Sequence, residues 1–273
     1  MSAISYCCGY WTIPSNPKHQ PDHYKRFLPL TLDMIRGQSL RLYCGDEETQ
    51  DFFKALCDER EIDFDPQITP IDSLPAWDLA QSFVESCKSM RLDIYPRPSS
   101  FHYEKGVTHY WRDYKDGGIA TYRSMIAIWL SKIYLCKSLA DERESENPVA
   151  WIDASLSRHS AIRTHNDISK LTIPDNKLLH YPNRMRFFGS TLPINASYLG
   201  AYAHSWNAVC EKFDSCCKRA ALLPYAGDEE TVLALCHGEN PELFEAIPSQ
   251  FKVTGQFGFK QRVTSAIRTI VGR

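Results

Sequence analysis

Short apolar runs alternate with amphipathic helical patterns over the first 152 residues, and this alternation constrains the fold more than any other feature. Apolar runs of roughly four to eight residues predict buried strands, and apolar residues spaced three and four apart predict helices. We expect strands at 4–10, 40–44, 67–71 and 149–152, and helices at 23–35, 48–59, 77–90 and 119–139. Strands that alternate with helices in this way form a mostly parallel sheet covered by helices on both faces. The sequence therefore predicts an α/β fold.

The pattern is less regular after residue 160. Candidate strands lie at 178–181 and 185–189, a long helix is expected at 196–221, and a shorter helix at 229–237. Because no internal repeat interrupts this stretch, we assign residues 1–247 to one Rossmann-like domain.

Two segments stand apart from this domain pattern. Residues 92–118 hold two prolines, three glycines and many aromatic residues, so we expect an inserted loop or lid, although a packed surface insertion fits equally well. Residues 248–273 contain five basic and no acidic residues, with apolar residues at helical spacing. This tail is expected either to lie on an anionic membrane surface as a peripheral contact or to pack on the domain.

The charge and the cysteines of the chain restrict its setting. A formal net charge of -2 argues against a nucleic-acid partner, since such binders usually carry a basic excess. The ten cysteines are scattered without any CxxC spacing, which favours thiols in a cytoplasmic protein. The N-terminus lacks the pattern of a signal peptide. We expect a cytoplasmic protein, with a membrane association only through the tail.

The tract Trp151-Ile152-Asp153-Ala154-Ser155 is the most informative for chemistry. It places one carboxylate at the end of a buried strand, where such a group is costly unless it is paired or binds a cation. Upstream, Ser131-Lys132 puts a cation on the helix that leads into this strand. Ligands of open α/β sheets bind beyond the carboxyl ends of the strands, which is where this carboxylate is expected.

The order of a lysine-bearing helix, a strand and a strand-end carboxylate resembles glycosyltransferases of the GT-A fold, including the glycogenin-like group. The chain departs from their DxD motif, because Ser155 stands at the second acidic position. It is more similar to the bacterial HtrL/YibB-like glycosyltransferase family, over residues 4–247. The motifs that carry this similarity are Ser131-Lys132, Trp151–Ser155, Phe187-Phe188-Gly189, Gly227-Asp228-Glu229 and Pro241–Phe244.

This resemblance implies transfer of a sugar from a nucleotide donor, with UDP favoured, to a surface glycan or glycolipid such as lipopolysaccharide or capsule. Asp153 would bind Mn²⁺ or Mg²⁺ and, through it, the donor diphosphate. His237 could complete the metal site in place of the missing carboxylate, and His180 is a weaker candidate. Asp228 or Glu229 would act as general base or as an electrostatic partner of the sugar.

The donor itself would be bound by residues from several segments. Lys132, with Arg123 as a weaker candidate, would neutralise phosphate, and Gly9, Tyr10 and Asp46 would frame the nucleoside. The donor-binding set also includes Trp151 and Ser155, which flank the strand-end carboxylate. Arg158 and Arg163 follow that strand and could reach phosphate or an anionic acceptor.

Each of these assignments has a structural alternative. Asp228 could only cap the helix that it precedes, Lys132 could be solvated, Tyr10 could be a core residue and His237 could be structural. At the level of function, a sugar nucleotidyltransferase and a catalytically decayed glycan-binding protein stay open. The first normally has a glycine-rich phosphate loop, where this chain has only Gly9.

Overall fold

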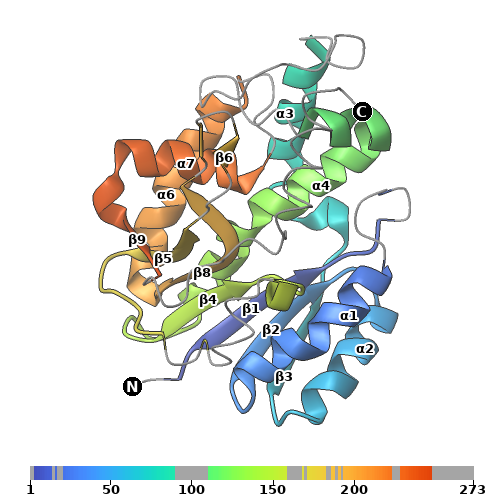
Figure 1. The fold of residues 1–273 in the computed structure, drawn as a ribbon, viewed down its shortest axis with the longest axis vertical. Helices are drawn as coiled ribbons and strands as arrows, with labels where there is room; N and C mark the ends of the chain where they lie inside the picture. The colour runs from blue at the N-terminus through green and yellow to red at the C-terminus, as the bar shows by residue number, and fades with distance from the viewer. Residues whose placement is uncertain are drawn as a thin grey trace.

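The fold is built on a seven-stranded sheet with the strand order β3-β2-β1-β4-β8-β5-β9 (Figure 1). The computed structural model describes residues 3–13, 16, 21–89, 110–158, 168, 171–182, 186–187, 190–191, 193–222 and 228–247. The strands of the sheet are β1 (Ser5–Tyr10), β2 (Ser39–Cys44), β3 (Asp63–Ile68), β4 (Pro148–Ile152), β5 (Leu178–Pro182), β8 (Ile194–Tyr202) and β9 (Phe244–Ala246). A separate two-stranded pair is formed by β6 (Arg186–Phe187) and β7 (Ser190–Thr191).

The first four strands are parallel to one another, since β1 pairs in parallel with both β2 and β4, and β2 with β3. Strand β8 runs antiparallel to β4 and to β5, and β9 is parallel to β5. One strand of seven is therefore reversed. This confirms the predicted α/β class with a mostly parallel sheet.

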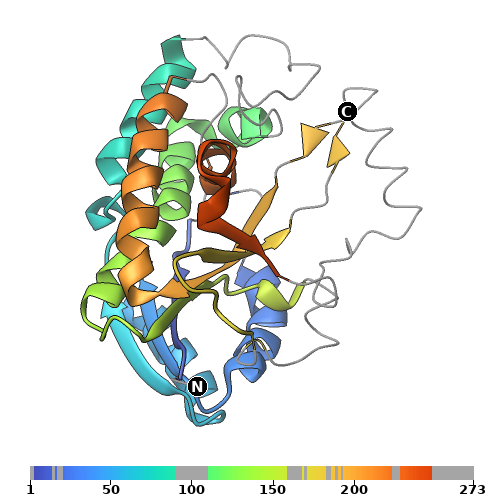
Figure 2. The same cartoon turned by 90° about the vertical axis from the view of Figure 1, so that its left-hand side faces the viewer.

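Helices cover both faces of this sheet (Figures 1 and 2). They are α1 (Pro21–Leu32), α2 (Glu47–Asp58), α3 (Trp77–Ser89), α4 (Tyr110–Asp141), α6 (Ala203–Ala220) and α7 (Glu229–Glu239). Alternate residues of β4 enter different cores: Val149 and Trp151 pack with α3, α4, α6 and α7, whereas Ala150 and Ile152 pack with α1 and α2. This alternation follows from the two-residue period of a strand, and burial on both faces explains why β4 is apolar throughout.

Two elements differ from the sequence-based expectation. Residues 196–202 were expected to begin a helix, but they belong to β8, and α6 starts only at Ala203. A buried apolar run fits either state, and here pairing with β4 on one side and β5 on the other decides for a strand. The third strand also lies four residues earlier than expected, at Asp63–Ile68.

The segment 92–118 is helical in the part that the structure describes. Helix α4 begins at Tyr110, so residues 110–118 are not the expected loop, and the backbone is interrupted only at Gly118, where φ is 74°. With ψ at 173°, Gly118 is not helical, so it separates the helical residues that begin at Tyr110 from the helix that follows, and glycine adopts such a positive φ without strain. The remainder of the expected lid, 92–109, the basic tail 248–273 and Arg163 lie outside the described residues.

The described helices include none that is long and apolar enough to cross a membrane. The nine cysteines whose side chains are described are free thiols, and eight of them are buried.

Candidate functional site

The strand order creates a topological switch point between β1 and β4. From β1 the chain proceeds outward to β2 and β3, then returns to place β4 on the other side of β1. The segment that follows β4, Leu156–Arg158, packs on α1, the helix that follows β1. Open α/β sheets bind ligands beyond the carboxyl ends of the strands, at the point where the strand order reverses. Gly9 and Tyr10 lie at the end of β1, and Asp153 directly follows β4.

Asp153 is the centre of a polar network at this end of β4. Asp153 and Trp151 are two residues apart and therefore face the same side of the sheet, which is the side covered by α4. The Trp151 indole Nε1 donates to Asp153 Oδ1 over 2.9 Å, and Lys132 Nζ on α4 donates to the same oxygen over 2.8 Å. The Lys132 ammonium also lies 5.6 Å from the centre of the Trp151 ring. The carboxylate is thus paired, as a buried charge requires.

Lys132 connects this carboxylate to a third segment of the chain. Its Nζ lies 2.6 Å from Glu229 Oε1 at the start of α7, and the Lys132 and Glu229 side chains are both 7 % exposed. Residues 132, 153 and 229 come from α4, the end of β4 and α7, and the packing of α7 on α4 and β8 brings them together. The structure therefore joins three of the residues selected from the sequence.

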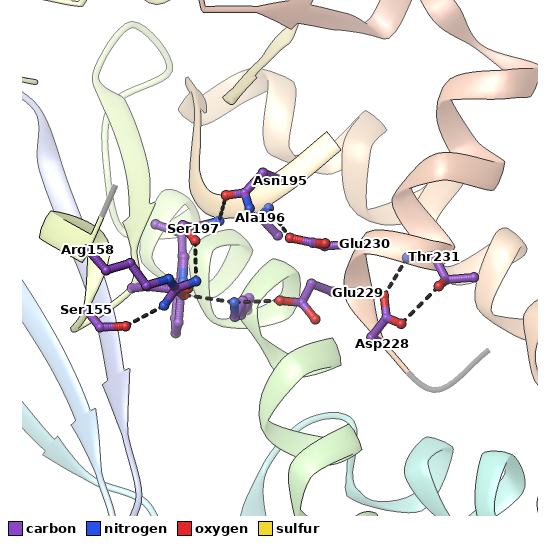
Figure 3. A network of polar contacts seen from close by, with 12 residues as sticks. Ser155, Arg158, Asn195, Ala196, Ser197, Asp228, Glu229, Glu230 and Thr231 are labelled. Carbon is purple, nitrogen blue, oxygen red and sulfur yellow. Dashed lines mark hydrogen bonds and ion pairs between the residues drawn. The ribbon is translucent and has the colours of Figure 1, made fainter. Parts of the chain in front are cut away.

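Arg158 lies on the other side of Asp153. It ends the short 3-10 turn Leu156–Arg158, and its NH2 group donates to Ser197 Oγ over 2.9 Å and approaches Asp153 Oδ2 at 3.5 Å. The Ser155 hydroxyl also accepts from this guanidinium. Figure 3 shows Arg158 with Ser155 and Ser197 at one side of the network and Glu229 at the other. These residues, together with Lys132, Trp151 and Asp153, are called the Asp153 network below.

Three consecutive acids open α7. Asp228 is its N-cap: Oδ1 accepts from the Thr231 backbone N–H over 2.6 Å, and Oδ2 accepts from the Thr231 hydroxyl over 2.9 Å (Figure 3). Glu230 Oε1 accepts from the backbone N–H of Ala196 on β8 over 3.1 Å. Each of the three carboxyl groups therefore has a structural partner: Thr231 for Asp228, Lys132 for Glu229 and the Ala196 backbone for Glu230.

The protonation of this site follows from burial and from its ion pairs. Burial alone would raise the pKa of Asp153, but the charges of Lys132 and Arg158 outweigh it and hold that pKa well below its usual range. Burial would likewise lower the pKa of Lys132, yet its two carboxylate partners raise it above the ordinary value. Both groups are therefore charged at neutral pH.

The acids of α7 behave differently, because burial dominates. Burial and the neighbouring Glu229 charge raise the pKa of Asp228 to about 7. Burial, followed by the charges of Glu229 and Asp228, raises the pKa of Glu230 to about 8. Burial also raises the pKa of Glu229, against the opposing effect of Lys132. The buried acids at the start of α7 therefore hold their protons to a higher pH than ordinary carboxyl groups do.

A pocket opens beside the network at the switch point. It lies where the end of β1 meets α1 and α4, two helices from opposite faces of the sheet. Its lining residues are mostly aromatic and apolar: Gly9, Tyr10, Trp11, Ile13, Asn16, Tyr24, Met125, Ile128 and Trp129. Burial raises the pKa of Tyr24, and the charges of Asp153 and Arg158 shift it further in opposite directions. Tyr24 therefore lines the pocket and is close enough to Asp153 and Arg158 for their charges to act on it.

Gly9 is required at the floor of this pocket. A Cβ atom at position 9 would lie 2.5 Å from a ring carbon of Trp11 and 2.8 Å from a ring carbon of Trp151. The Trp11 ring is itself fixed, because its Nε1 donates to the Thr69 carbonyl over 2.8 Å. Tyr10 contacts Tyr24 edge to face, with ring centres 4.9 Å apart, and both rings line the pocket.

Two predicted donor-binding residues support the network instead of facing the pocket. Trp151 is 1 % exposed, and its contribution is the hydrogen bond that orients Asp153. Ser155 is 2 % exposed and accepts from Arg158. Both side chains therefore hold other members of the network, and neither is among the residues that line the pocket.

Three other predicted residues are not brought to Asp153. Arg123 stacks on the Trp77 ring of α3, with its guanidinium carbon 3.8 Å from the ring centre, and precedes Lys132 on α4 by about 13 Å of helix. Asp46 is the N-cap of α2 and accepts from Thr49 N over 2.7 Å, although it does follow β2 at the same edge of the sheet.

His237 is the third of these residues. It lies near the end of α7, about 12 Å along the helix from Glu229, and its ring packs against Phe244 with centres 5.5 Å apart. His180 belongs to the same aromatic group, 6.4 Å from His237, and burial lowers the pKa of His180 to about 4. Both histidines therefore lie in an aromatic cluster with Phe244.

The residues around Asp153 do not fit the expected Mn²⁺ or Mg²⁺ ion. A hard divalent cation needs several oxygen ligands. Asp153 instead offers one carboxylate that is already contacted by an ammonium and a guanidinium group. In the described part of the chain, no three His, Cys, Asp or Glu side chains converge as metal ligands. We therefore derive no chemical step through a metal.

Several members of the site have no signal in the sequence. Ser197 and Glu230 contact the site through β8, which pairs with β4. Tyr24 and Trp129 line the pocket from α1 and α4, which pack on opposite faces of the sheet. These contacts are long-range, so only the order of the strands in the sheet could have revealed them.

The comparisons with known proteins add no family to this description. No protein-family model matches the chain, and no curated protein matches it. The functional assignment consequently depends on the geometry of the site and on the resemblance of short motifs.

Proposed function

We propose that this protein is a glycosyltransferase that moves a sugar from a nucleotide-sugar donor to an acceptor and that its domain has the GT-A fold. One observation supports this most: Lys132, Asp153 and Glu229, chosen from three separate motifs, form one buried ionic network at the switch point. The resemblance orders these motifs along the chain but says nothing of their meeting in space.

The adjoining pocket suits the nucleoside part of such a donor. Its aromatic walls, Tyr10, Trp11, Tyr24 and Trp129, offer faces on which a base can stack, and Gly9 makes room for the Trp11 ring. A nucleoside in the pocket would direct its phosphates toward the network, where Arg158 and Lys132 carry positive charge.

In this proposal the network acts by electrostatics. Cations held in fixed positions stabilise the negative charge that develops on the departing nucleoside diphosphate. Asp153 holds both cations, and Glu229 fixes Lys132 from the far side. Asp228 is fully buried as a helix cap, so Glu229 is the better candidate of the two acids for a role at the acceptor.

The acceptor and the setting follow from the resemblance alone. We expect a surface glycan such as lipopolysaccharide or capsule, UDP as the favoured nucleotide, a cytoplasmic protein, and a peripheral membrane contact through residues 248–273. Mn²⁺ or Mg²⁺ also remains an expectation of the resemblance.

Turnover of donors tests the proposal. Purified protein is incubated with a panel of UDP-, GDP- and CMP-sugars, with and without Mn²⁺, and the released nucleotide is measured by chromatography. Wild type should release nucleotide from one of the three donor classes. Asp153→Asn should reduce the rate of release by roughly 100-fold or more, since it removes the negative charge that holds Lys132 and Arg158 in place. Asp175→Asn, on an exposed loop, is the matched control and should leave the rate unchanged.

The other two functions predict different results. A sugar nucleotidyltransferase would convert a nucleoside triphosphate and a sugar phosphate into a nucleotide sugar with release of pyrophosphate. A glycan-binding protein would bind glycan but release no nucleotide from any donor. Either result would refute the transferase proposal.

A further inference from the structure

Two thiols meet where α6 packs against α7 (Figures 1 and 2). Cys236 Sγ on α7 lies 3.6 Å from the carbonyl oxygen of Lys212 on α6. In an α-helix that carbonyl also accepts from the backbone N–H four residues later, which belongs to Cys216. The Cys236 thiol therefore lies against the helical turn that ends at Cys216, and the two cysteine side chains share a hydrogen bond.

Arg219 connects the same two helices beside these thiols. Its NH2 group lies 3.1 Å from Cys216 Sγ and 2.6 Å from both carboxylate oxygens of Glu239, three residues after Cys236 on α7. The Arg219 and Glu239 side chains are 48 % and 51 % exposed. An exposed ion pair of this kind contributes little to stability. Its opening would give a small solute access to Cys216, although the thiol itself is buried.

The two sulfurs differ in how easily they lose a proton. The hydrogen bond with Cys236 lowers the pKa of the Cys216 thiol, and the Arg219 charge adds to this effect against that of burial. The same hydrogen bond, together with burial, raises the pKa of Cys236. Burial also raises the pKa of Cys210 and Cys217 on α6. Because the thiolate is the reactive form of cysteine, Cys216 is the better nucleophile of the pair.

A second thiol pair provides an internal comparison. Cys7 on β1 and Cys136 on α4 also share a hydrogen bond, but both belong to the main core and are 0 % exposed. Burial raises the pKa of Cys7 well above its ordinary value. Oxidation depends on thiolate character and on access, so the two pairs should react differently.

We infer that Cys216 and Cys236 form a redox-sensitive pair that hydrogen peroxide converts into a disulfide between α6 and α7. The Cys216 thiolate attacks one peroxide oxygen, the O–O bond breaks, and Cys216 becomes a sulfenic acid as hydroxide leaves. The Cys236 sulfur then attacks the Cys216 sulfur, the S–O bond breaks, and water leaves with the Cys236 proton. In total the two thiols give two electrons to one peroxide, which yields one disulfide and two waters.

The inference is independent of the proposed function. In a reducing compartment such a disulfide is usually transient and senses the redox state. The bridge would tie α7 to α6, and the first turn of α7 carries Glu229, the partner of Lys132 in the Asp153 network.

Peptide mapping of the full chain tests the inference. Reduced protein receives stepwise additions of hydrogen peroxide, catalase ends the reaction, and the remaining thiols are alkylated before digestion with trypsin without a reductant. Trypsin releases Cys216 and Cys217 together in peptide 213–218, and Cys236 in peptide 220–252. Mass spectrometry of wild type should find these two peptides linked at the lowest peroxide concentrations that consume thiol. Dithiothreitol should separate them again.

Two variants identify the sulfur that reacts, because peptide 213–218 holds two cysteines. Cys216→Ser should lose the linked peptides, whereas Cys217→Ser is the matched control and should form them like wild type. A link that persists in Cys216→Ser and is lost in Cys217→Ser would overturn the assignment. In wild type, a bridge between Cys7 and Cys136 that forms first, or oxidation of Cys216 beyond the sulfenic acid without any link, would also overturn the inference. The measurement on wild type needs no variant to fold.

Discussion

Replacement of Lys132 by methionine should destabilise the protein more than any other single change in the Asp153 network. Lys132 is 7 % exposed and is shared by Asp153, at 2.8 Å, and Glu229, at 2.6 Å. Methionine keeps the length of the side chain but leaves Glu229 without its cation and Asp153 with only Arg158, 3.5 Å away. Removing one partner of a buried ion pair costs about 3–5 kcal/mol. We therefore expect the free energy of unfolding to fall by about that amount.

Urea unfolding at pH 7.5, followed by tryptophan fluorescence, measures this loss. Lys137→Met is the control, because Lys137 lies on the same helix and pairs with Asp141 at the surface, where such a pair contributes about 0.2–1 kcal/mol. The double variant Lys132→Met/Glu229→Gln should recover part of the loss, since it also removes the Glu229 charge that Lys132 balanced. A Lys132→Met protein no less stable than Lys137→Met would refute the buried network.

Three further predictions follow from the same contacts. Asp228 and Glu230 have pKa values of about 7 and 8 in the folded state, above their unfolded values, so the folded protein binds more protons there and its stability should decrease as the pH rises from about 5 to 8. The melting temperature should fall less over this range in Asp228→Asn than in wild type. A melting temperature of wild type that rises with pH would contradict this prediction. Gly9→Ala should lower the free energy of unfolding by about 1–3 kcal/mol in urea, because its Cβ would overlap the Trp11 ring. Asp46→Ala should cost about 1 kcal/mol in the same assay through loss of the α2 cap, and Asp46→Asn, which can still cap, should restore most of it.

The first half of the fold could be predicted because its signals are local. The strands β1, β2 and β4 are short apolar runs, and α2 and α3 have regular apolar spacing, so each element is visible within its own residues. The class of the sheet follows from their alternation. The edge strand β3 is partly exposed and lacks such a run, and its position was predicted less well.

The second half depends on contacts that a local pattern does not contain. The run Ile194–Tyr202 is apolar enough for a buried helix or a buried strand, and pairing with β4 and β5 decides between them. Residues 92–118 were expected to form a loop because of their prolines, glycines and aromatic residues, whereas the residues from Tyr110 onward are helical up to a break at Gly118.

In the candidate site too, some features follow from local sequence signals and others from long-range contacts. The order of the motifs was enough to select Lys132, Asp153 and Glu229, and the structure brings them together. The hydrogen bonds around these residues were not predictable. Trp151 donates to Asp153 from within the core, and Arg158 donates to Ser197, which lies 39 residues away in the sequence. Such contacts become visible only when β8 is placed beside β4.

The central claim is that the switch point beside Asp153 binds a nucleotide, and thermal stability tests it most directly. The melting temperature of wild type and Asp153→Asn is measured with UDP, GDP and CMP at millimolar concentration, with and without Mn²⁺. Binding to the folded state raises the melting temperature by mass action. We predict that one nucleotide raises it in wild type and that the increase is lost in Asp153→Asn. An unchanged melting temperature with all three nucleotides, or an equal increase in both proteins, would contradict the account.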